Sequence, residues 1–168
     1  MKNHLLALAL LFFSSLSMAY DSVKGYGNTS WGMSPEEVIG AENGKVHKIT
    51  PPLEYYETLG LVGVDKVEIG GGNFKVVYQF KESKLVQVIV QSIDNKFVNI
   101  NKGLFQSVDS LLTQKYGTPI YKEPYKEIVW NVSGMNVNLS HTIIDGISNF
   151  VTVTYRPESE QAKKSDNL

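Results

Sequence analysis

The sequence contains no cysteine. This absence excludes disulfide bonds, a thiolate nucleophile and a lipid attached to a cysteine. Small exported domains commonly depend on disulfides, so an exported chain without them has to rely on its hydrophobic core. If the chain is exported, a bacterial periplasmic or secreted setting is therefore favoured over a eukaryotic extracellular one.

Arginine is almost absent, because Arg156 is the only one in the chain. The formal net charge is −1, from 16 basic and 17 acidic residues. Recognition of phosphates and base edges depends on arginine, and binding to a nucleic-acid backbone needs a basic face. We therefore expect no nucleic-acid partner and no attraction to an anionic membrane surface.

Long apolar runs are also missing, except near the start of the chain. There the basic Lys2 precedes an apolar run from Leu5 to Phe13, and Ser17-Met18-Ala19 supplies small residues at cleavage-site positions. The run is too short for a stable membrane span. Residues 1–19 are therefore predicted to be a secretory signal peptide cut after Ala19, which predicts a periplasmic or secreted location.

Side chains for metal binding or nucleophilic catalysis are scarce. His47 and His141, the two histidines beyond residue 19, have no partner ligand at helical spacing. We predict no metal, no cofactor and a core or edge role for His141. Ser140 and His141 are neighbours in a predicted strand, so they point to opposite faces and cannot easily form a triad with Asp145. No catalytic residue is assigned on this pattern.

The stretch Trp31 to Val38 carries the signals of a helix start. Ser34 can cap the first turn, Pro35 has no amide to leave unpaired, and Glu37 can reach back to the cap. Asn43-Gly44 supplies a left-handed stop about two turns later. The sequence therefore predicts a short helix from about Ser34 to Asn43.

A second helix is predicted to end at Tyr116-Gly117, with Pro119 just beyond. Its apolar stripe is expected to consist of Leu104, Val108, Leu111 and Leu112, with Phe105 at the border. After each helix, alternation of apolar and polar residues predicts three antiparallel strands. Turns are expected at Gly70–Asn73, Lys81–Lys84, Ser133–Met135 and Asp145-Gly146.

These elements predict an α+β fold in one domain over residues 20–156. Two helix-plus-three-strand units, at about 30–93 and 100–156, are expected to share an antiparallel sheet with both helices on one face. Tyr20 to Asn28 is predicted to be an extended arm, and residues 157–168 a disordered tail. Aligning the two units leaves an excess in the first one around Thr50 to Leu59, which is predicted to be a loop because Pro51-Pro52 interrupts the preceding strand.

The pattern resembles the family of tandem helix-and-sheet proteins typified by the β-lactamase inhibitor protein. Each unit also resembles the small outer-membrane assembly lipoprotein of the barrel-insertion machinery. The resemblance is carried by Gly32-Met33-Ser34 through Val38 and by Lys115-Tyr116-Gly117-Thr118-Pro119. It implies a non-enzymatic interaction protein. Because the chain lacks the disulfides of the first and the lipid-anchored cysteine of the second, their partners are not transferred.

Glu54, Tyr55, Tyr56 and Glu57 form the most suggestive cluster. Paired carboxylates beside aromatic rings are typical of sites that bind or cleave a sugar. We expect the loop 50–59 and the open sheet face to bind an unknown protein or envelope component. A small hydrolase of cell-envelope glycan or peptide, with Glu54 or Glu57 as acid/base, is the alternative, and a small apolar ligand between helices and sheet is a third.

Trp130 is a further binding candidate, although its place in an alternating strand favours the core. The run Gly70-Gly71-Gly72 is predicted to be a hairpin turn, because a phosphate loop needs a following helix.

Overall fold

The computed structural model describes residues 24–93, 97–145 and 147–159. The predicted signal peptide, residues 20–23 of the predicted arm, Gly146 and residues 160–168 of the predicted tail lie outside the described residues. The described helices are α1 (Pro35–Ala41) and α2 (Val98–Tyr116). The strands are β1 (His47–Tyr55), β2 (Thr58–Ile69), β3 (Gly72–Lys81), β4 (Lys84–Ser92), β5 (Tyr121–Glu123), β6 (Glu127–Val132), β7 (Met135–Ile144) and β8 (Ser148–Pro157).

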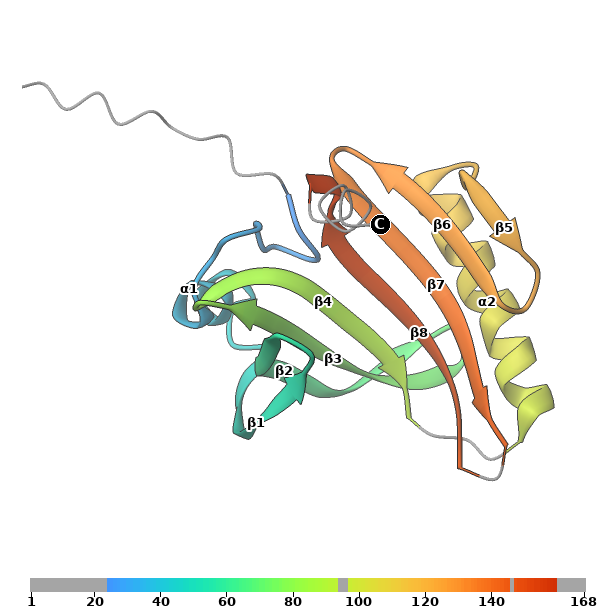
Figure 1. The fold of residues 1–168 in the computed structure, drawn as a ribbon, viewed down its shortest axis with the longest axis horizontal. Helices are drawn as coiled ribbons and strands as arrows, with labels where there is room; N and C mark the ends of the chain where they lie inside the picture. Colours follow the sequence, from blue (N-terminus) through green and yellow to red (C-terminus); the bar gives the residue numbers. More distant parts are fainter. Residues whose placement is uncertain (1–23, 94–96, 146, 160–168) are drawn as a thin grey trace, which may run out of the picture.

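All eight strands belong to one antiparallel sheet, in the order β1-β2-β3-β4-β8-β7-β6-β5 (Figure 1). The predicted α+β fold is confirmed. Each helix is followed by four strands, one more than expected. The additional strands are the two edges of the sheet: β5, and β1, which contains the brief strand expected before Pro51 and continues past it. The last strands of the two halves, β4 and β8, join them through a ladder from Val88↔Tyr155 to Gln91↔Thr152.

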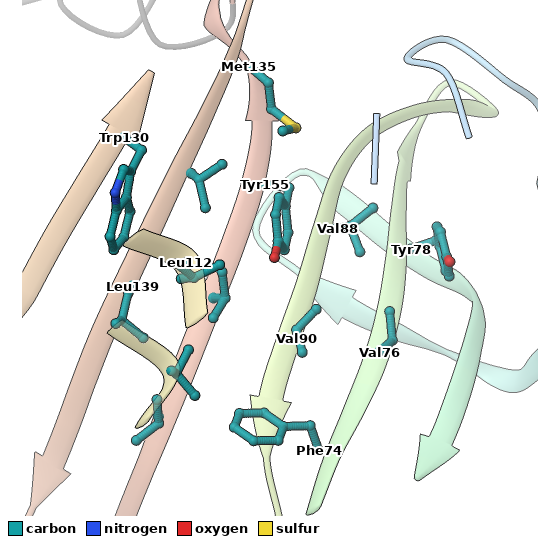
Figure 2. Close-up of a cluster of buried hydrophobic side chains, with 14 of the residues drawn as sticks. Phe74, Val76, Tyr78, Val88, Val90, Leu112, Trp130, Met135, Leu139 and Tyr155 are labelled. Carbon is teal, nitrogen blue, oxygen red and sulfur yellow. The ribbon is translucent and has the colours of Figure 1, made fainter. Parts of the chain in front are cut away.

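Both helices contribute to one hydrophobic core on one face of the sheet. Figure 2 shows part of this core, with Leu112 of α2 among residues of the strands. Apolar side chains alternate along the strands, so that Val88 pairs with Tyr155 across the centre, beside Tyr78 of β3. Val38 of α1 and Val108 of α2 are fully buried in the same cluster. We call the other face, which neither helix covers, the open face.

The short first helix forms as its capping residues predict. Ser34 Oγ accepts a hydrogen bond from the Glu37 amide at 3.3 Å, and Glu37 Oε2 accepts one from the Ser34 amide at 2.7 Å. After α1, Asn43 and Gly44 both have positive φ, so the left-handed stop is also confirmed.

The second helix is rotated relative to the predicted stripe. Its buried residues are Asn101, Phe105, Val108 and Leu112, whereas Leu111 is 45% exposed. Phe105 therefore lies at the centre of the buried side, and the assignment of Leu111 to that side was wrong. The register is set by packing against β7 and β8, where Asn101 Nδ2 donates to the Asn149 carbonyl at 2.7 Å.

The described part of the predicted arm is not extended. Lys24 and Ser30 form an isolated β-bridge, which closes a turn over residues 24–30. The turn places the Tyr26 ring 6.2 Å from the Tyr78 ring and 4.8 Å from the Tyr155 ring, between centroids. The prediction of an arm was wrong here because Tyr26 gains apolar contacts that local composition does not show.

Candidate functional site

The predicted loop from Thr50 to Leu59 is an edge hairpin. β1 continues through Pro51 and Pro52 to Tyr55, and β2 begins at Thr58, so the turn consists of Tyr56 and Glu57. The prolines do not end the strand because β1 is at the sheet edge, and they fall in an irregular stretch of pairing between Lys48 and Leu53. The first half exceeds the second here: β1 and β2 have 9 and 12 residues, against 3 and 6 in β5 and β6.

Two tyrosines form the tip of this hairpin. Tyr55 is 40% exposed and Tyr56 is 93% exposed. Their rings meet edge to face, with 4.9 Å between centroids. Tyr56 has φ of 50°, which is unfavourable for a large side chain. The hairpin therefore presents an aromatic pair to solvent at a conformational cost.

The two candidate carboxylates have different surroundings. Glu54 lies within β1, where it pairs with Leu59, and both residues are exposed. Glu57 lies in the turn, where its Oε2 is 2.6 Å from Lys81 Nζ. The contact shown for Glu57 is thus a surface ion pair with a lysine.

The other candidates lie on the helix side of the sheet. Trp130 is 1% exposed, and its Nε1 donates to the Gly117 carbonyl at 3.0 Å. It is a core residue, so its selection as a binding residue was wrong. His141 is also buried, with Nε2 at 2.8 Å from Asn149 Oδ1, as expected for a core histidine. Ser140 pairs with Thr152 on the open face, away from the His141 ring.

The open face presents rows of polar side chains across the sheet. Strand pairing places Gln79 opposite Gln87 and Arg156 opposite Asn136. The row reaches the β1–β2 hairpin, because Gly60 pairs with Gln79 and Thr58 Oγ1 donates to Gln79 Oε1 at 3.1 Å. The aromatic tip and the open face are therefore continuous.

Arg156 connects the two halves on this face. Its Nε donates to Gln87 Oε1 at 2.8 Å, across 69 residues of sequence. Gln87 is 7% exposed, and its Nε2 has no hydrogen-bond partner among the described residues. Sequence reasoning noted the single arginine only as an argument against nucleic acid, and this contact depends on strand order that the sequence does not reveal.

A buried cluster of tyrosines and one carboxylate was also missed by sequence reasoning. Glu42 Oε1 accepts from the Asn28 amide at 3.0 Å, and Gly27, with φ of 63°, leaves room for that carboxylate. Burial, then the Glu42 carboxylate, raises the pKa of Tyr78. Burial, then Tyr116, raises the pKa of Tyr155. The phenols are therefore held neutral, which favours a structural role in joining the halves.

The glycine run forms the β2–β3 turn, as predicted, and it also contacts α2. A Cβ at Gly70 would lie 3.1 Å from Ser107 Cβ, and one at Gly72 would lie 2.6 Å from Leu104 Cδ1. A cavity of about 390 Å³ lies beside this contact, lined mainly by the turn and by α2 from Ile100 to Ser107. Its polar and glycine-rich lining does not favour the apolar ligand considered from the sequence.

A second group of exposed apolar residues lies at the start of α2, the end of β7 and the start of β8, which Figure 1 shows at the same end of the molecule. Its most exposed members are Ile147 at 74%, Phe97 at 68% and Ile100 at 54%. This end is separate from the β1–β2 hairpin along the sheet.

Within the described residues, no three His, Cys, Asp or Glu side chains are grouped so that they could hold a metal ion. In the same part of the chain, neither helix has the length and apolar character needed to cross a bilayer. Comparison with protein-family models, curated proteins and solved structures gave no match. The resemblance to the tandem helix-and-sheet family therefore stays a prediction.

Proposed function

We propose that this chain is an exported, non-enzymatic binding protein of the bacterial envelope. It binds a protein or envelope component on the open face and the Thr50–Leu59 hairpin. The observation that carries the proposal is the Tyr55–Tyr56 pair, exposed at the edge of an uncovered sheet face. Tyrosine is common in interface anchors because it buries a large area at little cost in side-chain entropy.

The open face supports a role in docking. Gln79, Gln87 and Asn136 are buried there, whereas Gln91, Asn138, Thr152 and Thr154 are partly exposed. A surface of amides and hydroxyls can hydrogen-bond a polar partner, while the tyrosine tip supplies apolar contact. This combination of an apolar anchor and a polar surround is typical of protein–protein interfaces.

The alternative is a small hydrolase of envelope glycan or peptide with Glu54 or Glu57 as acid/base. It is the weaker proposal because Glu57 pairs with Lys81 instead of an acid. Replacing each glutamate with glutamine and measuring the turnover of purified cell-wall glycan tests it. Loss of a measured turnover in Glu54→Gln or Glu57→Gln would overturn the binding-only proposal.

Photo-crosslinking in living cells tests the binding proposal. A benzophenone amino acid at Thr154, on the open face, should capture a defined partner, and Tyr55→Ala/Tyr56→Ala should reduce capture at least tenfold. Ile120→Ala is the matched control, because Ile120 is 65% exposed but belongs to the opposite edge region. Capture that is unchanged in the double variant contradicts the hairpin assignment. Export is checked separately by sequencing the amino terminus of the periplasmic protein, which should begin at Tyr20.

A further inference from the structure

Arg156 has an unusual position on the open face. It is half-buried, and among the described residues it forms no ion pair with an Asp or Glu. The nearest described acid along the strand, Glu158, accepts a hydrogen bond from Asn131 at 3.5 Å. A guanidinium that is partly removed from water without a carboxylate has lost hydration that an ion pair could replace.

The side chains around Arg156 are neutral. The described residues that share the open face on β4, β7 and β8 are Gln87, Ile89, Gln91, Asn136, Asn138, Ser140, Thr152 and Thr154. These neighbours of Arg156 are uncharged, and the adjoining strands add two charges to the same face: Lys75 of β3, which pairs with Gln91, and Glu127 of β6, which accepts from Asn138 Nδ2 at 2.6 Å. A partner carboxylate placed at Arg156 would meet its positive charge with no Asp or Glu among the neighbours on β4, β7 and β8.

The two strands diverge at this point. The β4–β8 ladder ends at Val88↔Tyr155. Gln87 is the residue before Val88 on β4, and Arg156 is the residue after Tyr155 on β8. Figure 1 shows the start of β4 and the end of β8 separating beyond the ladder. The Arg156–Gln87 hydrogen bond therefore lies at the fork where β4 and β8 separate. It connects the two strands through side chains, beyond the end of their backbone pairing.

Gln87 supplies the second, independent observation. Its Oε1 accepts from Arg156 Nε, which fixes the orientation of the amide and leaves Nε2 as a donor. That Nε2 is buried without a hydrogen-bond partner in the described part of the chain. Buried donors are normally satisfied, and an unsatisfied one beside a cation is suited to an anionic acceptor.

We infer that Arg156 and Gln87 form a carboxylate-binding subsite on the open face, occupied by an Asp or Glu side chain of an acidic segment in a partner protein. The guanidinium Nη atoms donate to the two oxygens of the carboxylate, and Gln87 positions the guanidinium by accepting from Arg156 Nε. This inference rests on the proposed binding function and specifies its partner: an acidic segment across the fork, with the tyrosine tip as an apolar anchor at the edge.

The single arginine makes a direct test possible, because the protein has one arginine Nε–Hε signal in a 15N-correlated NMR spectrum. The probe is a triglutamate peptide with blocked ends, compared with the matched triglutamine peptide and with inorganic phosphate. We expect triglutamate to shift the Arg156 signal and a Gln87 amide signal in a saturable manner, and triglutamine to shift neither. Equal shifts with both peptides, or tighter binding of phosphate, overturn the carboxylate assignment.

Two variants separate the subsite from general charge attraction. Gln87→Met should weaken triglutamate binding about tenfold, and Arg156→Lys should do the same because the lysine loses the planar fork. Lys102→Gln, on the exposed side of α2, removes one positive charge away from the open face and should have no effect. Backbone amide signals show whether each variant is folded. Arg156→Lys keeps Gln87 and its buried side-chain amide. Unchanged binding in folded Gln87→Met overturns the two-residue subsite.

The result is distinguishable from failure of the proposed function. If Thr154 captures a partner that depends on Tyr55 and Tyr56 but triglutamate does not bind, only the carboxylate subsite is wrong. If triglutamate shifts the Arg156 signal but the tyrosine variants keep full capture, the subsite stands and the hairpin assignment fails.

Discussion

The Tyr26 ring packs on the Tyr155 ring with 4.8 Å between their centroids, so the first described segment is joined to the last strand. Aromatic pairs at this spacing contribute beyond their buried area. Tyr26→Ala should therefore lower the free energy of unfolding by about 2 kcal/mol in urea titrations. Tyr121→Ala, at a half-exposed ring on the edge strand β5, should cost less than half as much. Equal costs would show that Tyr26 does not stabilise the core.

Alkaline pH should destabilise the protein through its buried phenols. Burial raises the pKa of Tyr78 and of Tyr155 above the ordinary value, so the folded state keeps protons that the unfolded state releases. The free energy of unfolding should be unaffected by these groups below about pH 9 and fall above about pH 10, by up to about 1.4 kcal/mol per pH unit for each. Urea titrations from pH 8 to 11 measure this slope. Tyr155→Phe should reduce it, and an unchanged slope contradicts the assignment.

The two tryptophans should respond differently to replacement. Trp130 Nε1 donates to the Gly117 carbonyl, whereas the buried Trp31 Nε1 has no hydrogen-bond partner among the described residues. Trp130→Phe should cost about 2–3 kcal/mol, since it loses both volume and a hydrogen bond. Trp31→Phe should cost about 1 kcal/mol less, because it removes an unsatisfied donor together with the lost volume. Equilibrium unfolding of both variants checks the order, which a larger cost at Trp31 would contradict.

The glycine turn offers a matched pair of substitutions. Gly70 and Gly71 have φ of 58° and 83°, so alanine is disfavoured at both by about 1 kcal/mol. Only at Gly70 would the added Cβ approach α2, at 3.1 Å from Ser107 Cβ, while nothing lies within 4 Å at Gly71. Gly70→Ala should therefore be the more destabilising in thermal unfolding. Equal melting temperatures would mean that the turn does not press on α2.

Replacing Tyr56 should raise the stability of the fold and weaken binding to the partner. Asparagine tolerates a positive φ better than tyrosine does, so Tyr56→Asn should stabilise the fold by about 0.5–1 kcal/mol while it weakens partner capture. Tyr125, with φ of 61°, is the control, because its hydroxyl accepts from Gln106 Nε2 at 2.6 Å and its ring contacts Phe105. Tyr125→Asn should destabilise the fold. A destabilised Tyr56→Asn would mean that the exposed ring is structural.

Local elements agreed well with the sequence. The Ser34–Glu37 capping box and the stop at Asn43-Gly44 depend on residues a few positions apart, so propensity and capping chemistry are sufficient to predict them. The turn at Glu82-Ser83 also formed as predicted, although neither residue is glycine and both have positive φ. In these places local preference and tertiary structure agree.

The errors occurred where a long-range partner overrides local preference. Pro51-Pro52 would interrupt a central strand, but β1 is an edge strand, and edge position is a property of strand order. Tyr26 lies in a glycine-bearing polar stretch, yet it packs on Tyr78 and Tyr155. Leu111 is apolar at helical spacing, yet the packing of α2 on β7 and β8 leaves it exposed.

The candidate site was predicted in part. Tyr55 and Tyr56 were selected as aromatic residues beside two carboxylates, in the stretch by which the predicted first unit exceeds the second, and the structure places them, both exposed, at the end of β1 and in the β1–β2 turn. The sequence by itself determined the α+β class, the helix caps and the alternation that gives the sheet an apolar and a polar face, because these follow from residues close together in the chain. Only the tertiary structure decided that β4 pairs with β8 and that Arg156 meets Gln87, because strand order is set by burial of the whole core and brings together residues 69 positions apart.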